Sequence, residues 1–216
     1  MDYDKRYIFL GPPGSGKGTQ ANRIAKNLHL PHIDMGNTIR HAIKTGTDAG
    51  LKAKSFVEAG QLVPAKIVIE MAMERLKKDD TKNGFILDGF PRSIEQADAL
   101  EEYLAEKQFG IRVLNLQVPV EKIVERLGNR ILCSHCGAVY NKVTKLPKVE
   151  GKCDSCDNAL YIRADDNPDT IRNRFKTYEA ETAPLIDFYK QRGNLVDVEA
   201  DGDIDEITEA IMKVVS

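Results

Sequence analysis

Residues 11–19 read GPPGSGKGT, a stretch that could bind the phosphates of a nucleotide. Glycines let the backbone wrap closely around phosphate groups, and the amides of such a loop point toward them. The helix expected directly after the loop places the positive end of its dipole at the same point. Lys17 adds a mobile charge that can reach the β- and γ-phosphates. The candidate phosphate ligands are Gly14, Ser15, Gly16, Lys17, Gly18 and Thr19.

Two other interpretations of this loop fit the sequence less well. A glycine-rich turn with an incidental lysine would not need the apolar strand before it and the helix-forming residues after it. A dinucleotide-binding turn requires GxGxxG, whereas the glycines here run Gly14-x-Gly16-x-Gly18. Gly18 also replaces the usual Ser or Thr after the lysine, so the loop predicts phosphate contact more strongly than ligation of Mg²⁺ by Thr19.

A second stretch, FILDGFPR at 85–92, could hold Mg²⁺ and an anion. Asp88 ends an expected buried strand, where its carboxylate can bind Mg²⁺ or the waters around it. Gly89 lets a ligand approach the backbone. Arg92 then follows at the carboxyl edge of the sheet, where ligands bind in such folds. A simple salt bridge between Asp88 and Arg92 is the alternative.

All four cysteines lie in two CxxC pairs, separated by residues 137–152. This spacing is typical of a zinc ribbon, in which two tight turns supply four thiolates to one tetrahedral ion. Four protein ligands leave no open position, so the metal would be structural. Disulfides are disfavoured in the reducing compartment that we expect, and a redox pair normally uses one CxxC at a helix start. The predicted ligands are Cys133, Cys136, Cys153 and Cys156.

Short apolar strands and longer helices alternate along the chain and must position these residues. Strands are predicted at 7–10, 32–33, 85–87, 113–118 and 195–198. Helices are predicted near 17–28, 38–45, 49–59, 64–78, 93–107, 120–129, 169–190 and 203–215. The apolar strand runs lack strict alternation, which is typical of strands covered by helices on both faces. The pattern predicts a P-loop-type α/β fold with a parallel sheet of five strands.

Several local signals add detail to this pattern. Ser93 should cap a helix while Gln96 reaches back to the cap, and Asp203 should cap the last helix. Pro184 should kink the long helix or split it after Thr182. Arg126 and Arg130 are spaced i, i+4, which places both on one face of a predicted helix.

Two segments interrupt the alternation and are interpreted as insertions on the core. Residues 34–63 form two short helices with no strand between them. Residues 131–162 lose the helical pattern and contain few large apolar side chains, so we expect irregular chain that a metal ion stabilises.

Composition sets the broad class of protein. The chain has 216 residues, 42% hydrophobic and 30% charged, a balance typical of a globular protein, and its net charge of −2 gives no sign of a nucleic-acid or membrane partner. No apolar run is long enough for a signal-peptide core or a membrane span. We therefore expect a cytoplasmic protein that binds neither nucleic acid nor membranes.

Taken together, the phosphate loop and the Asp88–Arg92 stretch resemble the adenylate kinases, in the form with an extended lid. The similarity extends over essentially the whole chain. It includes Gly36-x-x-x-Arg40, Gln61–Val63, Glu125-Arg126, Arg130, Val139-Tyr140, Arg163-x-Asp165-Asp166 and Arg172-x-Arg174.

The resemblance implies a core of residues 1–33, 64–125 and 165–216, a monophosphate-binding insertion at 34–63 and a zinc-containing lid at 126–164. It implies the Mg²⁺-dependent reaction ATP + AMP = 2 ADP, which maintains adenine nucleotide balance, carried out by a monomer. The attacking group would be a phosphate oxygen, which is already largely ionised at neutral pH, so no general base is needed. Accordingly, His29, His32, His41 and His135 are expected to fill surface or core positions.

The resemblance also implies which residues bind each nucleotide. AMP would contact Met35, Gly36, Arg40, Gln61, Leu62, Val63, Gly89, Phe90, Arg92, Gln96, Arg163 and Arg174. ATP would contact the phosphate loop together with Arg126, Arg130, Val139, Tyr140 and Ile204. The catalytic group would comprise Lys17, Asp88, Arg92, Arg126, Arg130, Arg163 and Arg174. Guanidinium groups suit this role because the two nucleotides bring many negative charges together.

Two departures from the family pattern keep other functions open. Met35 stands where many relatives carry a threonine, and Ile204 lies near where relatives often place a lysine. These changes would fit a related kinase with another acceptor, such as UMP or CMP, or with GTP as donor. A nucleotide-gated RNA-binding protein is a further alternative. Against it, Tyr140 alone offers an aromatic platform near the cysteines, and acidic residues are mixed with the lysines there.

Overall fold

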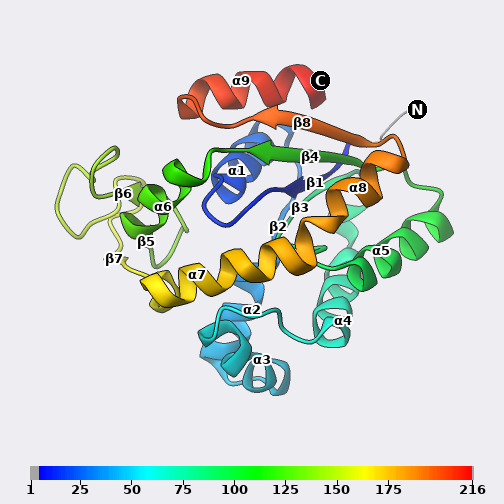
Figure 1. Ribbon diagram of the computed structural model, residues 1–216, viewed down its shortest axis with the longest axis horizontal. Helices are drawn as coiled ribbons and strands as arrows, with labels where there is room; N and C mark the ends of the chain where they lie inside the picture. The colour runs from blue at the N-terminus through cyan, green and yellow to red at the C-terminus, as the bar shows by residue number, and fades with distance from the viewer. Residues whose placement is uncertain (1–4, 216) are drawn as a thin grey trace.

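The computed structural model describes residues 5–215, and a parallel sheet lies at its centre (Figure 1). Residues 1–4 and 216, which the predicted core segment includes, lie outside the described residues. All neighbouring strands of this sheet pair in parallel, which confirms the predicted five-stranded fold. Its strands, in spatial order, are β2 (His32–Asp34), β3 (Phe85–Asp88), β1 (Arg6–Leu10), β4 (Arg112–Gln117) and β8 (Leu195–Glu199).

Helices cover both faces of the sheet, as expected for strands that are mostly apolar. Tyr7 and Phe9 pack in one core layer with α1 (Lys17–Leu28) and α9 (Ile204–Val215). The neighbouring β1 residues, Ile8 and Leu10, belong to the layer on the other face. That layer is built from α4 (Ala65–Leu76), α5 (Ile94–Lys107) and α8 (Pro184–Gln191). Figure 1 shows α9 and the α4–α5 pair on opposite sides of the sheet.

The start of α5 confirms the predicted cap and corrects its partner. Ser93 Oγ accepts a hydrogen bond from Gln96 N at 3.4 Å. The Gln96 side chain does not complete the predicted reciprocal bond. Its Oε1 accepts instead from the backbone N of Arg92 at 2.8 Å, because the side chain turns toward the preceding loop. At the last helix, Asp203 Oδ1 accepts from Asp205 N at 2.8 Å, in agreement with a capping role.

The long helical segment near the carboxyl terminus is split as predicted. It consists of α7 (Pro168–Thr177), a π-helical turn (Tyr178–Thr182) and α8, which begins at Pro184. Proline has no N–H and its ring crowds the preceding turn, so a regular α-helix cannot continue through it. The widened turn is closed by a hydrogen bond of 2.8 Å from Ala183 N to Tyr178 O.

The first insertion contains α2 (Met35–Thr45) and α3 (Asp48–Glu58), which lie beyond the edge of the main sheet (Figure 1). Helix α2 begins at Met35, earlier than the predicted 38–45. Asp34 caps it, because its Oδ1 accepts from Asn37 N at 2.8 Å.

The predicted irregular chain at 131–162 is wrong in part, because this segment contains a small antiparallel sheet. Its strands are β5 (Arg130–Cys133), β6 (Val139–Asn141) and β7 (Leu160–Tyr161), in the order β6-β5-β7. Helix α6 (Val120–Gly128) ends before Arg130, so Arg126 and Arg130 do not share a helix face as predicted. Arg130 instead opens the first strand of the lid.

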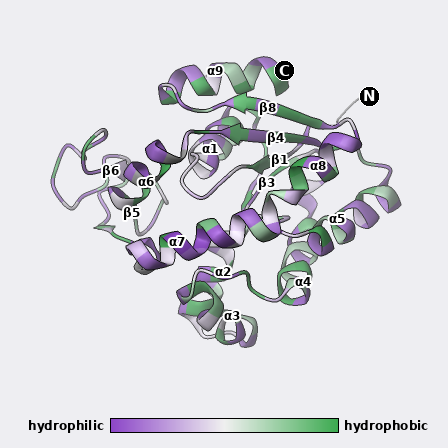
Figure 2. Ribbon diagram, in the orientation of Figure 1, coloured by the Kyte–Doolittle hydropathy of each residue, from purple (hydrophilic) through white to green (hydrophobic). Residues whose placement is uncertain are grey.

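Two short 3₁₀ turns, Asp79–Thr81 and Ala164–Asp166, complete the described elements. Figure 2 shows α7 as mostly hydrophilic along its length, whereas α4 is mostly hydrophobic. This contrast follows from position, since α4 belongs to the core layer and α7 runs past the cavity described next. Within residues 5–215, the helices are too short or too polar for any of them to span a bilayer.

Candidate functional site

A cavity of about 1680 Å³ lies between the main sheet and the two insertions. The residues around it come from the phosphate loop, the ends of β2 and β3, the first insertion, the lid and α7. Of the predicted nucleotide ligands, only Met35 and Phe90 do not line it. Both side chains are fully buried in the core layer that contains α4 and α5. The first turn of α2 and the loop after β3 direct both side chains into the core, and contact between these two residues and AMP stays a prediction.

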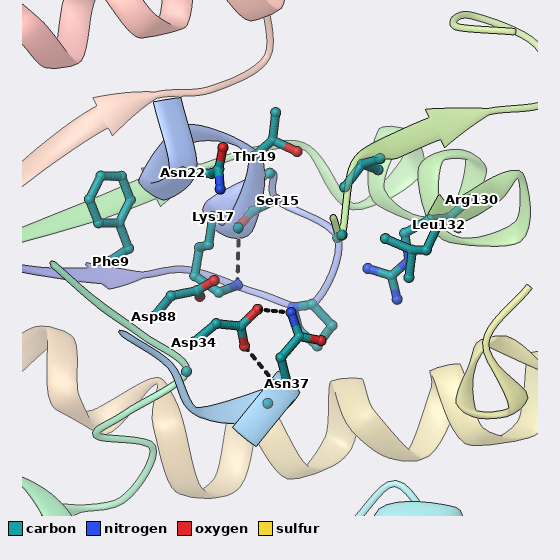
Figure 3. A pocket seen from close by; sticks show the side chains of 18 of the residues that line it. Phe9, Ser15, Lys17, Thr19, Asn22, Asp34, Asn37, Asp88, Arg130 and Leu132 are labelled. Atoms are coloured by element: carbon teal, nitrogen blue, oxygen red, sulfur yellow. Dashed lines mark hydrogen bonds between the residues drawn. The ribbon is translucent and has the colours of Figure 1, made fainter. Parts of the chain in front are cut away.

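The side chain of Lys17 folds back onto the phosphate loop. Lys17 Nζ donates to Gly11 O and Pro12 O, each at 2.7 Å, and lies 3.3 Å from Ser15 Oγ (Figure 3). Burial lowers the pKa of Lys17 to about 7, partly offset by Asp88 and reinforced by the nearby arginines. A Cβ at Gly14 would lie 2.8 Å from Ile123 and Leu127 of α6, and its φ of +84° also favours glycine. The loop therefore presents a positive, tightly folded end of α1 to the cavity.

Asp88 lies at the end of β3, close to this loop. A Cβ at Gly18 would lie 3.1 Å from Asp88 Oδ2, so the glycine after Lys17 allows the carboxylate to approach α1. Burial acts to raise the pKa of Asp88, but His32, Lys17 and Arg92 more than offset it and hold the pKa below its usual value. Asp88 is therefore ionised at neutral pH.

His32 is a neighbour of Asp88 that the sequence analysis did not single out. Its Nε2 lies 3.5 Å from Asp88 Oδ2, and it helps to lower the pKa of that carboxyl. The only available signal was topological. His32 begins β2 and Asp88 ends β3, and these neighbouring parallel strands pair His32 with Ile86, two residues before Asp88.

Arginines from several segments converge on the cavity, and two carboxylates hold them. Arg163 pairs with Asp165, and its Nε donates to Oδ1 at 2.8 Å. Arg130 pairs with Asp166, with Nε donating to Oδ2 at 2.8 Å. Arg174 Nη1 lies 3.1 Å from Asp166 Oδ1 and 3.4 Å from Asp165 Oδ2. Figure 3 shows Arg130 across the cavity from Lys17.

Two carboxylates do not balance the positive charge of the arginines in this cluster. Burial, followed by the positive charge of Arg163, lowers the pKa of Arg174 to about 9. The same two causes lower the pKa of Arg40 to about 10. Guanidinium groups that disfavour their own charge in this way are suited to bind anions.

The four cysteines gather at one point of the lid. Their Sγ atoms all lie within 4.8 Å of one another, and the Cys133–Cys156 and Cys136–Cys153 pairs are 3.5 Å apart. All four are free thiols, so the disulfide interpretation is wrong for this structure. Tetrahedral Zn²⁺ with bonds of about 2.3 Å separates its sulfur ligands by roughly 3.8 Å. The cluster therefore fits zinc.

Tyr140 belongs to this cluster more than to the nucleotide cavity. Its hydroxyl donates to Cys153 Sγ at 3.5 Å and accepts from Asp154 N at 2.7 Å. The side chain is only 3% exposed. The hydrogen bond from Tyr140 lowers the pKa of Cys153 to about 6, which favours the thiolate. Tyr140 still borders the cavity, as predicted, but its polar end points toward the thiolates.

Comparisons with known proteins agree with this geometry. The sequence model of the family described as adenylate kinase matches residues 9–194. An adenylate kinase of Caldicellulosiruptor bescii is 46% identical over 209 residues, covering 96% of this chain and 97% of that protein. Adenylate kinases of Thermodesulfovibrio yellowstonii and Archaeoglobus fulgidus are also 46% identical, over 95% and 94% of this chain and 96% and 94% of their own. A chain with this cavity and these matches belongs to the adenylate kinase family.

Proposed function

We propose that this chain transfers the terminal phosphoryl group of ATP to AMP, forming two molecules of ADP, and catalyses the reverse reaction. The observation that carries the proposal is the meeting of the phosphate loop, Asp88 and arginines from several segments around one cavity. Membership of the adenylate kinase family supports the same reaction. ATP, AMP and ADP are the corresponding substrates and products.

In this reaction an oxygen of the AMP phosphate bonds to the γ-phosphorus of ATP while the bond from that phosphorus to the β–γ bridging oxygen breaks. The attacking oxygen is already ionised, so the protein needs no general base. Its residues act by position and charge. Lys17 and the loop amides would hold the phosphates of ATP, and Arg40 with Arg92 would hold the AMP phosphate.

The remaining arginines would stabilise charge on the group in transfer. Arg130, Arg163 and Arg174 already share the carboxylates Asp165 and Asp166, so they are held close together before a nucleotide binds. Preorganised charges of this kind need little rearrangement as the transition state forms. Mg²⁺ bound with ATP would neutralise part of the phosphate charge, and Asp88 would hold the ion or its waters.

The two insertions would close over the core during this reaction and exclude water, which would otherwise hydrolyse ATP. The proposed divisions are a core of 1–33, 64–125 and 165–216, a monophosphate-binding segment at 34–63 and a lid at 126–164. A Zn²⁺ ion held by the four cysteines would stabilise the lid. We further propose that the protein works as a cytoplasmic monomer.

A related kinase with another base preference is the second candidate. Ile204 motivates it at the donor end, because an apolar side chain offers no hydrogen bond to a base. At the acceptor end the Met35 side chain is buried, so it neither supports nor opposes adenine there.

A coupled assay of ADP formation tests the proposal directly. ATP would be supplied with AMP, CMP, UMP or GMP in separate reactions, and GTP would replace ATP in a parallel series. We expect ATP with AMP to give the highest kcat/KM. Comparable turnover with CMP or UMP would favour the second candidate instead.

A further inference from the structure

A polar group is buried between α1 and α9, in an otherwise apolar layer. Gln20 is 2% exposed and Thr208 is 7% exposed. Gln20 Nε2 donates to the backbone carbonyl of Ile204 at 2.9 Å. The Thr208 hydroxyl lies 2.8 Å from both Gln20 Oε1 and Ile204 O. The hydroxyl has one proton and donates to one of these two oxygens at a time, so Gln20, Thr208 and the carbonyl of Ile204 form a small hydrogen-bonded group at the first turn of α9.

Stability alone gives little reason for an amide at this position. The apolar layer between α1 and α9 contains Ala21, Ile24, Ile207 and Ile211. Burying an amide in apolar surroundings costs free energy that its hydrogen bonds offset only in part, and a leucine could fill a similar volume. The polar group therefore calls for an explanation in terms of what it positions.

Its place in the fold supplies that explanation. Gln20 directly follows Thr19, the last residue of the predicted phosphate-binding loop, and Ile204 lies at the predicted base end of the ATP site. Gln20, Ile204 and Ile207 all line the cavity. One side chain thus links the phosphate-binding start of α1 to the base-binding start of α9.

The apolar side chain of Ile204 makes this link important for selectivity. A base packed there would find no polar group on that side chain, so the backbone groups of Gly202, Asp203 and Ile204 that border the cavity are candidates to discriminate between bases. An adenine amino group can donate to a backbone carbonyl, whereas the guanine carbonyl at the same position cannot. Backbone groups discriminate in this way only when they are held at fixed positions.

We propose that Gln20 and Thr208 are positioning residues that fix the start of α9 relative to the phosphate loop and thereby let the donor site select adenine over guanine. The inference rests on the proposed function, since it concerns the ATP end of the same cavity. Neither residue needs to touch the phosphoryl group in transfer. Their effect is expected on donor affinity and base preference.

The test compares Gln20→Leu and Thr208→Val with the unmodified chain, using ATP and GTP as donors and AMP as acceptor. We expect the KM for ATP to rise roughly tenfold in each variant, corresponding to the loss of about one buried hydrogen bond. The ratio of kcat/KM for ATP over GTP should fall with it, and the KM for AMP should stay within about twofold. Thr208→Ser, which keeps the hydroxyl, should restore the ratio. Calorimetric titration with ATP and with GTP gives a second readout that does not depend on turnover.

Thr81→Val is the matched control. Thr81 is 3% exposed, and its hydroxyl donates to Leu76 O at 2.8 Å or Lys78 O at 2.7 Å, away from the cavity. This variant should lower Tm with no change in the ATP-to-GTP ratio.

The outcomes separate this proposal from the proposed function. If Gln20→Leu and Thr208→Val lower Tm as Thr81→Val does and leave the ratio unchanged, the group is only structural and the proposal is wrong. If Gln20→Leu does not fold, Thr208→Val and its serine counterpart decide the question. Failure of the unmodified chain to form ADP from ATP and AMP would instead overturn the proposed function.

Discussion

The ammonium group of Lys17 can bind backbone carbonyls in the free protein or the phosphates of a bound nucleotide. Without a nucleotide its ammonium group binds the carbonyls of Gly11 and Pro12, and its pKa is about 7 because the side chain is buried near other cations. A bound polyphosphate would surround the same group with negative charge and favour its protonated form. Nucleotide binding and protonation of Lys17 should therefore be coupled.

Proton uptake at pH 8 is the first expected consequence. Between the pKa of about 7 in the free protein and the ordinary value near 10.5, Lys17 is mostly neutral when free and charged when bound. ADP binding should consume up to one proton at pH 8 and almost none at pH 6. Calorimetry in buffers of different ionisation enthalpy measures this number. Lys17→Arg, which stays charged, should abolish the uptake, and equal uptake in both proteins would contradict the assignment.

The lowered pKa of Lys17 also determines whether the free energy of unfolding rises or falls with pH. From about pH 7 to pH 10.5 the unfolded chain carries the Lys17 proton and the free folded protein largely does not. The unfolded state therefore binds more protons, and the free energy of unfolding contributed by Lys17 rises with pH in this window.

Loss of a single phosphate-binding cation should remove most activity. Lys17→Ala and Arg92→Ala are each expected to lower kcat by roughly 100-fold or more, because both remove charge aimed at a phosphate. Circular dichroism should show an unchanged fold. Arg192→Ala is a matched control, since Arg192 packs over the ring of Phe188 away from the cavity. Retained turnover in Lys17→Ala or Arg92→Ala would refute their assigned roles.

Among the elements, the lid depends most on something other than apolar packing. Its buried cluster consists of Cys133, Tyr140 and Cys153, with a few partly buried neighbours. Its strands contain only two to four residues. Such a segment buries too little apolar surface to offset its ordering entropy, so a metal ion held by the four cysteines would serve as its core.

Metal removal should therefore melt the lid and spare the main sheet. The lysines at 142, 145, 148 and 152 are exposed, but a folded backbone resists cleavage. Under reducing conditions, a chelator should therefore speed cleavage by trypsin at these lysines while peptides of the main sheet stay protected. Mass spectrometry of the timed digest locates the cuts, and Cys153→Ser should behave in the same way without a chelator. An unchanged melting profile and digest after chelation would rule out a structural metal.

Tyr140 should contribute to metal affinity through its hydroxyl group. Tyr140→Phe removes the bond to Cys153 Sγ and the acceptor for Asp154 N. We expect metal affinity to fall roughly 10- to 100-fold, a range typical for lost partners of metal ligands. Competition with a chromophoric chelator measures it. Tyr161→Phe is the control, because Tyr161 lies in the same lid but is 42% exposed; an equal loss in both variants would contradict a specific role.

Elements with strong local signals were predictable from the sequence. The cap at Ser93 and the break at Pro184 follow from backbone chemistry within a few residues, and the CxxC spacing predicted that the four cysteines gather at one point. The lid strands were not predictable, because two to four residues show no periodicity and tertiary contacts decide their pairing. Arg130 was misplaced for the same reason.

The sequence also could not predict that the side chains of Met35 and Phe90 point into the core. Each stands beside residues that line the cavity, and only the packing of α2 and of the loop after β3 on the core layer turns its side chain away from that cavity.

Across the whole molecule, α7 connects the parts that must act together. Thr177 Oγ1 donates to Gly60 O at 3.2 Å, and Thr170 Oγ1 lies 3.4 Å from Glu58 O, so α7 contacts the end of the first insertion. Just before α7, Asp166 pairs with Arg130 of the second insertion and with Arg174 of α7 itself. A shift of either insertion would therefore change the contacts of the arginines around the cavity.

Gathering these arginines around the cavity destabilises the folded protein when no nucleotide is bound. Arg40 is half-buried, burial and Arg163 lower its pKa to about 10, and within residues 5–215 its buried Nε has no hydrogen-bond partner. Both effects disfavour the charged form in the folded state. A site built to hold the anions of two nucleotides should therefore be less stable when it is empty than the same fold with fewer cations.

The variant Arg40→Gln should separate the stability of the free protein from its binding of AMP. Removing the cation relieves burial and repulsion, so the Tm of the free variant should equal or exceed that of the unmodified chain. AMP at about 100 times its Kd should stabilise the unmodified chain by about 2.7 kcal/mol, whereas the variant should lose most of that gain. Scanning calorimetry with and without AMP measures both quantities.

Arg172→Gln is the matched control, because Arg172 is an exposed arginine on α7 paired with Asp169. A lower Tm in free Arg40→Gln, together with an undiminished response to AMP, would show that Arg40 stabilises the fold rather than binding the monophosphate.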